Sequence, residues 1–178
     1  VNDGKNLVVE MRFKTYILII LLFSSQFYFS QVKYSTISNG NWNSSSTWDN
    51  GVPPNPLFEF DTIVVNHDVF YNHNQTVQGV IIIDTNGIVT SSSSADMLIG
   101  KDATNKGEFI NYGYFHINSM RVEPDNCGVN DTKPSARNYG TIIFDDELNV
   151  GIGCGSGFFY NYYNSNFTIN NELHIDGY

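Results

Sequence analysis

Charge is scarce in this chain, and basic charge most of all. Only 15% of the 178 residues are charged, and 9 Lys and Arg stand against 18 Asp and Glu. Nucleic acids and anionic membrane surfaces, which attract basic patches, are therefore poor partners. Long helices are not favoured, because the helix-forming residues alanine, lysine and arginine are few. Asn, Gly, Thr and the β-forming Ile, Val, Phe and Tyr dominate instead. The aromatic content of 15% also argues against a disordered tail, and the length fits one domain.

The chain also lacks an apolar run of the length that spans a membrane. Tyr16 to Phe23 (YILIILLF) is far shorter than the roughly 20 apolar residues that a membrane anchor needs. A basic start at Met11 to Lys14 precedes this run and the polar residues 24–26 follow it, which is typical of a secretory signal peptide. We predict that residues 11–30 are this peptide.

Residues 1–10 precede the better start at Met11, and we interpret them as a mis-assigned beginning. Removal of residues 1–30 leaves 6 basic residues (9 − 3) and 16 acidic ones (18 − 2), a net charge of −10. We therefore expect a secreted protein, extracellular or on the outer cell surface, with no transmembrane segment in the mature chain.

Apolar and polar residues alternate in five short units that share one pattern. Each unit reads apolar, any, apolar, then a few Asn, Asp, Ser or His residues, then apolar, any, apolar. The units are IVVNHDVFY from Ile63, IIIDTNGIV from Ile81, FHINSMRV from Phe115, IIFDDELNV from Ile142 and FTINNELHI from Phe167. Each half has the period of two that marks a strand with one buried face. The wide interval between the second and third units contains Met97-Leu98-Ile99, where we expect a further strand.

Two all-β architectures use such units. In an antiparallel β-sandwich each unit is a hairpin with a tight polar loop. In a parallel β-helix each unit is part of one coil, and equivalent residues stack about 4.8 Å apart. We predict the second, a right-handed parallel β-helix or β-solenoid over residues 61–178, with the sandwich as the alternative.

Cysteine occurs only twice, and its spacing favours the solenoid. Cys127 and Cys154 each follow an Asn-Tyr-Gly, at Asn111 and Asn138, and the two landmarks recur at the same interval (138 − 111 equals 154 − 127). Equivalent positions on successive coils lie within the roughly 4.4–6.8 Å between Cα atoms that a disulfide requires. Secretion would place both thiols in an oxidising compartment. We predict a Cys127–Cys154 disulfide, and two unrelated buried cysteines are the alternative.

The Asn-Tyr-Gly repeat predicts a stacked corner. Asn111, Asn138 and Asn161 are expected to share amide hydrogen bonds from coil to coil. Gly113 and Gly140 are expected to adopt a backbone conformation that other residues resist. Tyr163 stands where a third glycine would be, so the last coil should depart there.

Residues 31–60 differ in composition and are predicted to cap the solenoid. This segment holds both tryptophans, Trp42 and Trp48, and three of the five prolines. A solenoid exposes an apolar end that must be covered, and two indoles would cover it. The alternative is that Trp42 and Trp48 contact a glycan; such residues are more often buried.

The run GNWNSSSTWDNGVPP (residues 40–54), followed by DTIVVNHDV and later Asn-Tyr-Gly coils, resembles the start of secreted surface β-helix proteins that Gram-negative bacteria export by the type IX system. The resemblance covers most of residues 34–178 and implies a β-helix on the cell surface. It implies little about activity. Family members usually end in a sorting domain and none is visible here, so we expect the chain, which stops within a coil, to be a fragment.

Candidate chemistry is sparse. Parallel β-helices also carry polysaccharide lyases, which use acidic calcium sites and a basic residue. The nearest loop offers Glu123, Asp125, Asp131, Lys133 and Arg137, but calcium needs six or more oxygen ligands, so we expect a solvated loop. Asp145 and Asp146 are explained by a turn and Glu147 by solvent exposure.

The histidines, His67, His73, His116 and His174, form no metal-type pair and are expected at the surface. No G-x-S-x-G, H-E-x-x-H or Walker loop occurs in the sequence. We predict no catalytic residue and no cofactor, with calcium the one ion to consider.

The predicted function is a structural, adhesive or glycan-contacting surface module, with polysaccharides or other surface proteins as partners. Tyr160, Tyr162 and Tyr163 are further aromatic candidates for a glycan. The alternative is an N-terminal fragment of a polysaccharide lyase or glycoside hydrolase.

Overall fold

The computed structural model describes residues 30–100, 107–123, 133–151 and 156–175. Those from Gln31 onward form one compact unit. It consists of short strands and one 3-10 helix, η1 (Ser45–Thr47), and the described ranges contain no α-helix. The signal-peptide region and both cysteines lie outside the described residues, so those predictions stay predictions.

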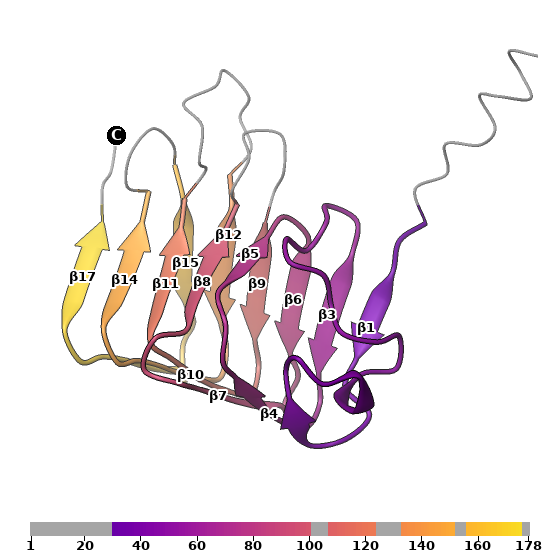
Figure 1. Ribbon diagram of the computed structural model, residues 1–178. Coiled ribbons are helices and arrows are strands. Elements are labelled where there is room, and N and C mark those ends of the chain that lie inside the picture. Colours follow the sequence, from indigo (N-terminus) through magenta and orange to yellow (C-terminus); the bar gives the residue numbers. More distant parts are fainter. Residues whose placement is uncertain (1–29, 101–106, 124–132, 152–155, 176–178) are drawn as a thin grey trace, which may run out of the picture. The chain divides into compact units, whose positions relative to one another are not determined.

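Three parallel sheets form the faces of a β-solenoid, and each complete coil supplies one strand to each sheet (Figure 1). The first sheet contains β1 (Lys33–Ser35), β3 (Thr62–Val65), β6 (Val80–Ile83), β9 (Glu108–Asn111), β12 (Ser135–Asn138) and β15 (Phe158–Asn161). The second contains β2 (Gly40–Asn41), β4 (Asp68–Tyr71), β7 (Ile88–Ser91), β10 (Tyr114–Ile117), β13 (Thr141–Phe144) and β16 (Asn166–Ile169). The third contains β5 (Gln75–Val77), β8 (Asp96–Ile99), β11 (Ser119–Val122), β14 (Glu147–Val150) and β17 (Glu172–Ile175).

Every pairing between these strands is parallel, which confirms the solenoid and excludes the antiparallel sandwich. Alternate residues of each strand point inward, so the core is a column of stacked apolar side chains, such as Ile63, Ile81 and Phe109 in the first sheet. The strand expected around residues 97–99 is β8.

The five sequence units do not all occupy the same place in a coil. The first two, from Ile63 and Ile81, join the first sheet to the second, at what we call the first corner. The other three, from Phe115, Ile142 and Phe167, join the second sheet to the third, at the second corner. The five units therefore share a pattern but occupy two different positions in the coil. Both corners need a few polar residues between two alternating strands, so their sequences look alike.

The first corner carries the predicted asparagine ladder. Asn111 donates from Nδ2 to Asn138 Oδ1 at 2.8 Å, and Asn138 donates in the same way to Asn161 at 2.8 Å. Gly113 and Gly140 are required for a different reason from the one predicted. Neither has a positive φ. Instead, a Cβ on Gly140 would collide with the carbonyl oxygen of Gly113 in the coil before, so glycine permits the close stacking of backbones.

The last coil departs at the predicted place. Four residues (162–165) separate β15 from β16, whereas two (139–140) separate β12 from β13. Asn164 takes up the longer turn with a φ of 68°, in the left-handed region that asparagine tolerates.

Residues 31–60 form an incomplete first coil. β1 pairs with β3, β2 pairs with β4, and Leu57 forms a parallel bridge with Val77 of the third sheet. Trp42 and Trp48 lie in the core of this coil, in edge-to-face contact with ring centroids 5.0 Å apart. Trp48 Nε1 donates to the carbonyl oxygen of Trp42 at 2.7 Å. The segment therefore continues the parallel backbone pairing of all three sheets, and its two indoles fill the interior of the coil.

Candidate functional site

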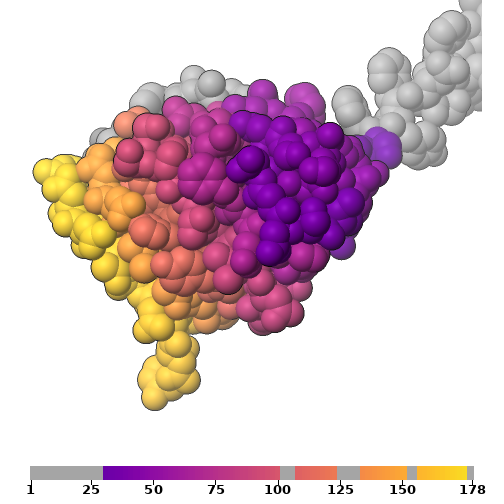
Figure 2. Space-filling view, turned by 60° about the horizontal axis from the view of Figure 1, so that its bottom comes forward, coloured from indigo at the N-terminus to yellow at the C-terminus, as the bar shows by residue number. Residues whose placement is uncertain are grey.

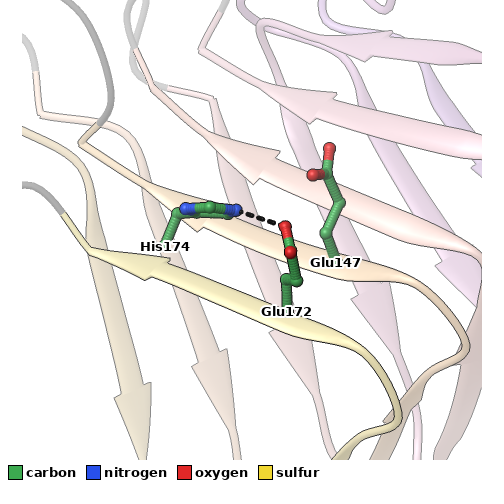
Figure 3. Close-up of side chains that lie close together, drawn as sticks. All are labelled: Glu147, Glu172 and His174. Atoms are coloured by element: carbon green, nitrogen blue, oxygen red, sulfur yellow. Dashed lines mark hydrogen bonds and ion pairs between the residues drawn. The ribbon is translucent and has the colours of Figure 1, made fainter.

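An acidic and imidazole cluster lies on the outer face of the third sheet (Figure 3). Glu147 comes from β14, while Glu172 and His174 come from the neighbouring β17. The register pairs Glu147 with Glu172, and the period of two brings His174 to the same face. Nε2 of His174 lies 2.8 Å from Glu172 Oε2, and one ligand atom from each of the three residues lies within 4.8 Å of the others.

This cluster offers two carboxylates and one imidazole to a cation. Calcium takes six to eight oxygens, so the set falls short of a calcium site. Three nitrogen and oxygen ligands match a zinc-type ion more closely. Arg121 of β11 competes for the same carboxylate, because its Nη2 lies 3.6 Å from Glu147 Oε1. Both carboxylates therefore have a protein partner.

Three tyrosines stack along the outside of the first corner. The rings of Tyr112 and Tyr139 lie 5.0 Å apart at 15°, and those of Tyr139 and Tyr162 lie 4.1 Å apart at 14°. All three side chains are exposed. The hydroxyl hydrogen bond with Tyr162, with a smaller contribution from partial burial, raises the pKa of Tyr139. Since Tyr139 has a ring on each face, the stack presents mainly its edges and hydroxyls to solvent.

The stack broadens into an aromatic surface on the last coil. Tyr160 of β15 lies 6.5 Å from the ring of Tyr162 and is stacked on Phe158 at 5.9 Å and 10°. Tyr163, in the long turn, is 94% exposed. Figure 2 shows this coil, in yellow, at one end of the described unit, with a projection in the same colour. We call Phe158, Tyr160, Tyr162 and Tyr163 the aromatic surface.

The tryptophans proposed for glycan contact do not belong to this surface. Trp42 is 0% exposed and Trp48 is 2% exposed, so neither ring presents a face to a ligand. The physical reason is that both indoles pack inside the first coil, where Trp42 contacts Trp48 and the Tyr71 ring of the next coil edge to face. The suggestion of a glycan contact at these two residues was therefore wrong, whereas Tyr160, Tyr162 and Tyr163 are exposed as that role requires.

The loop considered for calcium is only partly described. Asp125 and Asp131 lie outside the described residues. Arg137 forms an ion pair with Glu108 of the preceding coil, and Lys133 lies over the Phe158 ring, 5.8 Å from its centroid. Both cations of the loop are therefore engaged with side chains on the first sheet.

Asp145 and Asp146 contact side chains of neighbouring coils at the second corner. Asp145 accepts from Asn170 and contacts His116 Nε2 at 2.8 Å, and Asp146 accepts from Asn171. His116 and His174 face outward, as predicted.

His73 differs from the surface position expected for it. Its ring packs on Tyr71 at 4.9 Å and on Trp42 at 6.0 Å. Burial lowers the pKa of His73, and the hydrogen bond with Gln75 opposes part of this effect. Its Nδ1 is buried and has no hydrogen-bond partner among the described residues. Two large aromatic neighbours from different coils make this environment, which no local pattern around His73 reveals.

Sequence reasoning missed the Tyr112–Tyr139 stack and the convergence of Glu147 with Glu172. Both were within reach. The tyrosine follows the repeated asparagine in each copy, and Glu147 and Glu172 occupy the same register position one coil apart.

No helix in the described part of the chain has the length and apolar character to cross a membrane. Comparisons of the whole chain with protein-family models, with curated proteins and with solved structures give no match.

Proposed function

We propose that the chain is an extracellular or cell-surface β-solenoid module that contacts a neutral polysaccharide through the aromatic surface. The exposed tyrosines of the last coil carry this proposal. Tyrosine combines an apolar ring with a hydroxyl that forms hydrogen bonds, which suits a ligand with both C–H and hydroxyl groups. Exposed aromatic groups that gather on one surface mark interaction sites more often than single exposed side chains do.

The surroundings of the aromatic surface favour a neutral ligand. The part of the chain after residue 30 has a net charge of −10, which repels anionic polymers over the Debye length of about 8–10 Å. Asn164, Ser165 and Asn166 lie beside the tyrosines in the long turn and on β16. The Asn164 amide is a hydrogen-bonding group of the kind that sugar hydroxyls need, while the Ser165 hydroxyl donates to Asn161 Oδ1 and the Asn166 amide donates to Thr141 Oγ1, so these two offer oxygens that accept.

The binding test is affinity electrophoresis through gels that contain a neutral or an anionic polysaccharide. We expect retardation by a neutral polymer. The double variant Tyr160→Ala/Tyr163→Ala should lose it, since an aromatic contact contributes about 1 kcal/mol and two such losses weaken binding roughly 30-fold. This variant leaves the stack of Tyr112, Tyr139 and Tyr162 intact.

The matched control is Phe70→Ala on β4, because Phe70 and Tyr160 are equally exposed at 43%. Phe70→Ala should bind as the unaltered chain does. Equal retardation of the double variant and the control would refute the aromatic surface as the binding site.

Export and the disulfide belong to the same proposal. The register pairs Val122 with Val150 at the ends of β11 and β14, and Cys127 and Cys154 follow these two residues by five and four positions. The interval between coils at this pair (150 − 122) is one position longer than the interval at the first corner (138 − 111). Thiol labelling and mass spectrometry of protein from its native secretion test the pairing: two labelled thiols would contradict it.

A second candidate, cleavage of a polysaccharide, is favoured by one observation. Arg121, Glu147, Glu172 and His174 share the outer face of the third sheet, so basic and acidic groups lie close together. Proton abstraction needs a base within hydrogen-bond reach of its substrate. The test is release of reducing ends from polysaccharides, with Glu172→Gln and His174→Gln as variants. Activity that survives both substitutions would exclude this cluster.

A further inference from the structure

The inward side chains of the last coil are exposed, unlike their equivalents one coil earlier. Leu148 is 1% exposed, whereas its register partner Leu173 is 49% exposed; Val150 is 5% exposed and its partner Ile175 is 65% exposed. A hollow of about 270 Å³ opens here. It is lined by Leu148, Val150, Gly157, Phe158, Phe159, Phe167, Leu173 and Ile175. The apolar column of the core therefore reaches the surface at this end.

The backbone at the same end also lacks partners among the described residues. β15, β16 and β17 are each the terminal strand of their sheet. Natural edge strands are often protected by lysine, proline or a bulge. These three strands read FFYN, NFTI and ELHI and contain neither lysine nor proline. The opposite edge differs, since β1 is only three residues long and begins with Lys33.

The asparagine ladder gives this end a direction. Each Nδ2 group donates toward the next coil: Asn111 to Asn138 Oδ1 and to the Thr141 carbonyl, and Asn138 to Asn161 Oδ1 and to the Asn166 carbonyl. Within the described ranges the ladder begins at Asn111, whose Oδ1 is buried next to Ile83 and has no hydrogen-bond partner there. Asn161 holds the same position in the last coil, so its amide is oriented to donate to a further coil.

We propose that the end formed by β15, β16 and β17 is a docking face for one more parallel β-solenoid coil of the same repeat, supplied by a polypeptide segment outside residues 31–175. The occupant carries an asparagine at the first corner, to accept from Asn161, and apolar side chains at the inward positions, to fill the hollow. Its three strands pair in register with the open edges. The tyrosine stack continues with the aromatic residue that follows the occupant's asparagine.

A second copy of this chain fits the face less well. Its first coil offers only five strand residues, three in β1 and two in β2, against the twelve of β15, β16 and β17. The interior of that coil is already filled by Trp42 and Trp48. Two copies joined by their last coils would pair antiparallel, and the directional amide ladder requires parallel register.

The experiment adds one coil of this kind to the chain. A copy of residues 133–151 is appended after Tyr178, which leaves five connecting residues before the copied β12. The third and first sheets are joined by two residues between β5 and β6 and by twelve between β11 and β12, so five is within the native range. Hydrogen exchange measured by mass spectrometry then compares the β15, β16 and β17 amides with and without the extension.

We expect these amides to exchange about tenfold more slowly in the extended chain, as edge strands become internal ones. The control extension has alanine at the copied positions of Asn138, Ile142 and Leu148, and it should give no protection. Equal exchange with both extensions would overturn the proposal. The proposal would also be overturned if these amides became more protected in the unextended chain as the protein concentration rises, because the occupant would then be a second copy.

A second measurement covers an extended chain that fails to fold. A synthetic peptide with the sequence of residues 133–151 is added to the unextended chain, and exchange is followed against peptide concentration. Saturable protection confined to β15, β16 and β17 supports the docking face, and its absence at every soluble concentration refutes it. Neither outcome depends on polysaccharide binding, which the Tyr160 and Tyr163 variants test separately.

Discussion

Replacement of Asn138 by alanine is the sharpest test of how the coils are held together. Asn138 is completely buried at the first corner. Its Oδ1 accepts from Asn111 Nδ2 at 2.8 Å and from the backbone N–H of Gly140 at 3.1 Å. Its Nδ2 donates to Asn161 Oδ1 at 2.8 Å and to the carbonyl oxygen of Asn166 at 2.9 Å. One side chain therefore joins three successive coils.

The expected loss of stability depends on which hydrogen bonds the partners of Asn138 keep after the substitution. Four hydrogen bonds at about 1 kcal/mol each set an upper figure of about 4 kcal/mol. Three of the four partners retain a second hydrogen bond: Asn111 Nδ2 with Thr141, the Gly140 N–H with the Asn111 carbonyl, and Asn161 Oδ1 with Ser165. Asn138→Ala should therefore lower the free energy of unfolding by about 2–3 kcal/mol.

The two neighbours in the ladder supply matched controls. Asn111→Ala also loses its donated bonds, but it removes a buried Oδ1 that has no partner in the described part of the chain, so it should lower the free energy of unfolding by only about 1–2 kcal/mol. Asn161 is exposed, and Asn161→Ala should cost less than about 1 kcal/mol. The predicted order of destabilisation is Asn138, then Asn111, then Asn161.

Urea unfolding followed by far-ultraviolet circular dichroism measures these free energies, and the slope of the transition checks that unfolding stays cooperative. Indole fluorescence alone would report on the first coil, where both tryptophans lie, and solenoids can unfold coil by coil. A cost below about 0.5 kcal/mol for Asn138→Ala, or a reversed order, would refute the argument that buried amides join the coils.

Three further predictions test other parts of the solenoid. Trp42→Ala should cost about 3–5 kcal/mol in urea unfolding, because a fully buried indole leaves a cavity, whereas Ile37→Ala at an exposed position of the same coil should change stability by less than about 0.5 kcal/mol. Gly140→Ala should prevent close stacking on Gly113 and lower the melting temperature. Gly51→Ala is the comparison, because no described atom lies within 4 Å of its added Cβ but its φ is 79°, so it reports backbone strain without a clash; equal losses of melting temperature would contradict the clash. Because the pKa of His73 is lowered in the folded chain, the unfolded chain binds more protons in acid. The stability that the neutral His73 ring contributes is therefore complete above the unfolded pKa near 6.5, and it is lost as the pH falls below that value. The melting temperature should therefore fall from pH 7 to pH 5 less steeply in His73→Gln than in His174→Gln, and equal slopes would contradict the assignment.

The fold was predictable because each coil repeats the same physical constraints. Alternation with a period of two indicated strands, and the recurrence of Asn111 and Asn138 indicated the interval between coils. The three-sheet arrangement was harder to predict. Strand-to-strand connections at both corners have similar length and polarity, so the units at Ile81 and Phe115 share one sequence pattern although they lie at different corners.

The candidate sites depended on contacts between coils, which one-dimensional spacing shows only after the register is known. Glu147 and Glu172 are adjacent because β14 and β17 pair, and neither residue has a distinctive local sequence. The burial of Trp42 and Trp48 could be expected, because tryptophan is usually largely buried. The contact of Trp42 with His73 could not, because His73 lies in a turn of the following coil. Composition cannot reveal an environment assembled from two coils.

The connections between successive coils show where this solenoid can change without loss of its core. One to four residues join the strands at the first and second corners, whereas the connections from the third sheet back to the first vary from two residues after β5 to twelve after β11. Corner residues stack on their equivalents in the neighbouring coils, through the asparagine ladder at the first corner and the Asp–Asn pairs at the second. A change that displaced one of these side chains would break its hydrogen bonds, whereas the longer turn at 162–165 leaves the bond between Asn138 and Asn161 in place. The third connection carries no such ladder among the described residues, so extra residues cost little beyond loop-closure entropy, which grows only slowly with length. Sequence variation that alters binding should therefore concentrate at this edge and on the outer sheet faces, while the two ladder-bearing corners preserve the register that the last coil offers to its neighbour.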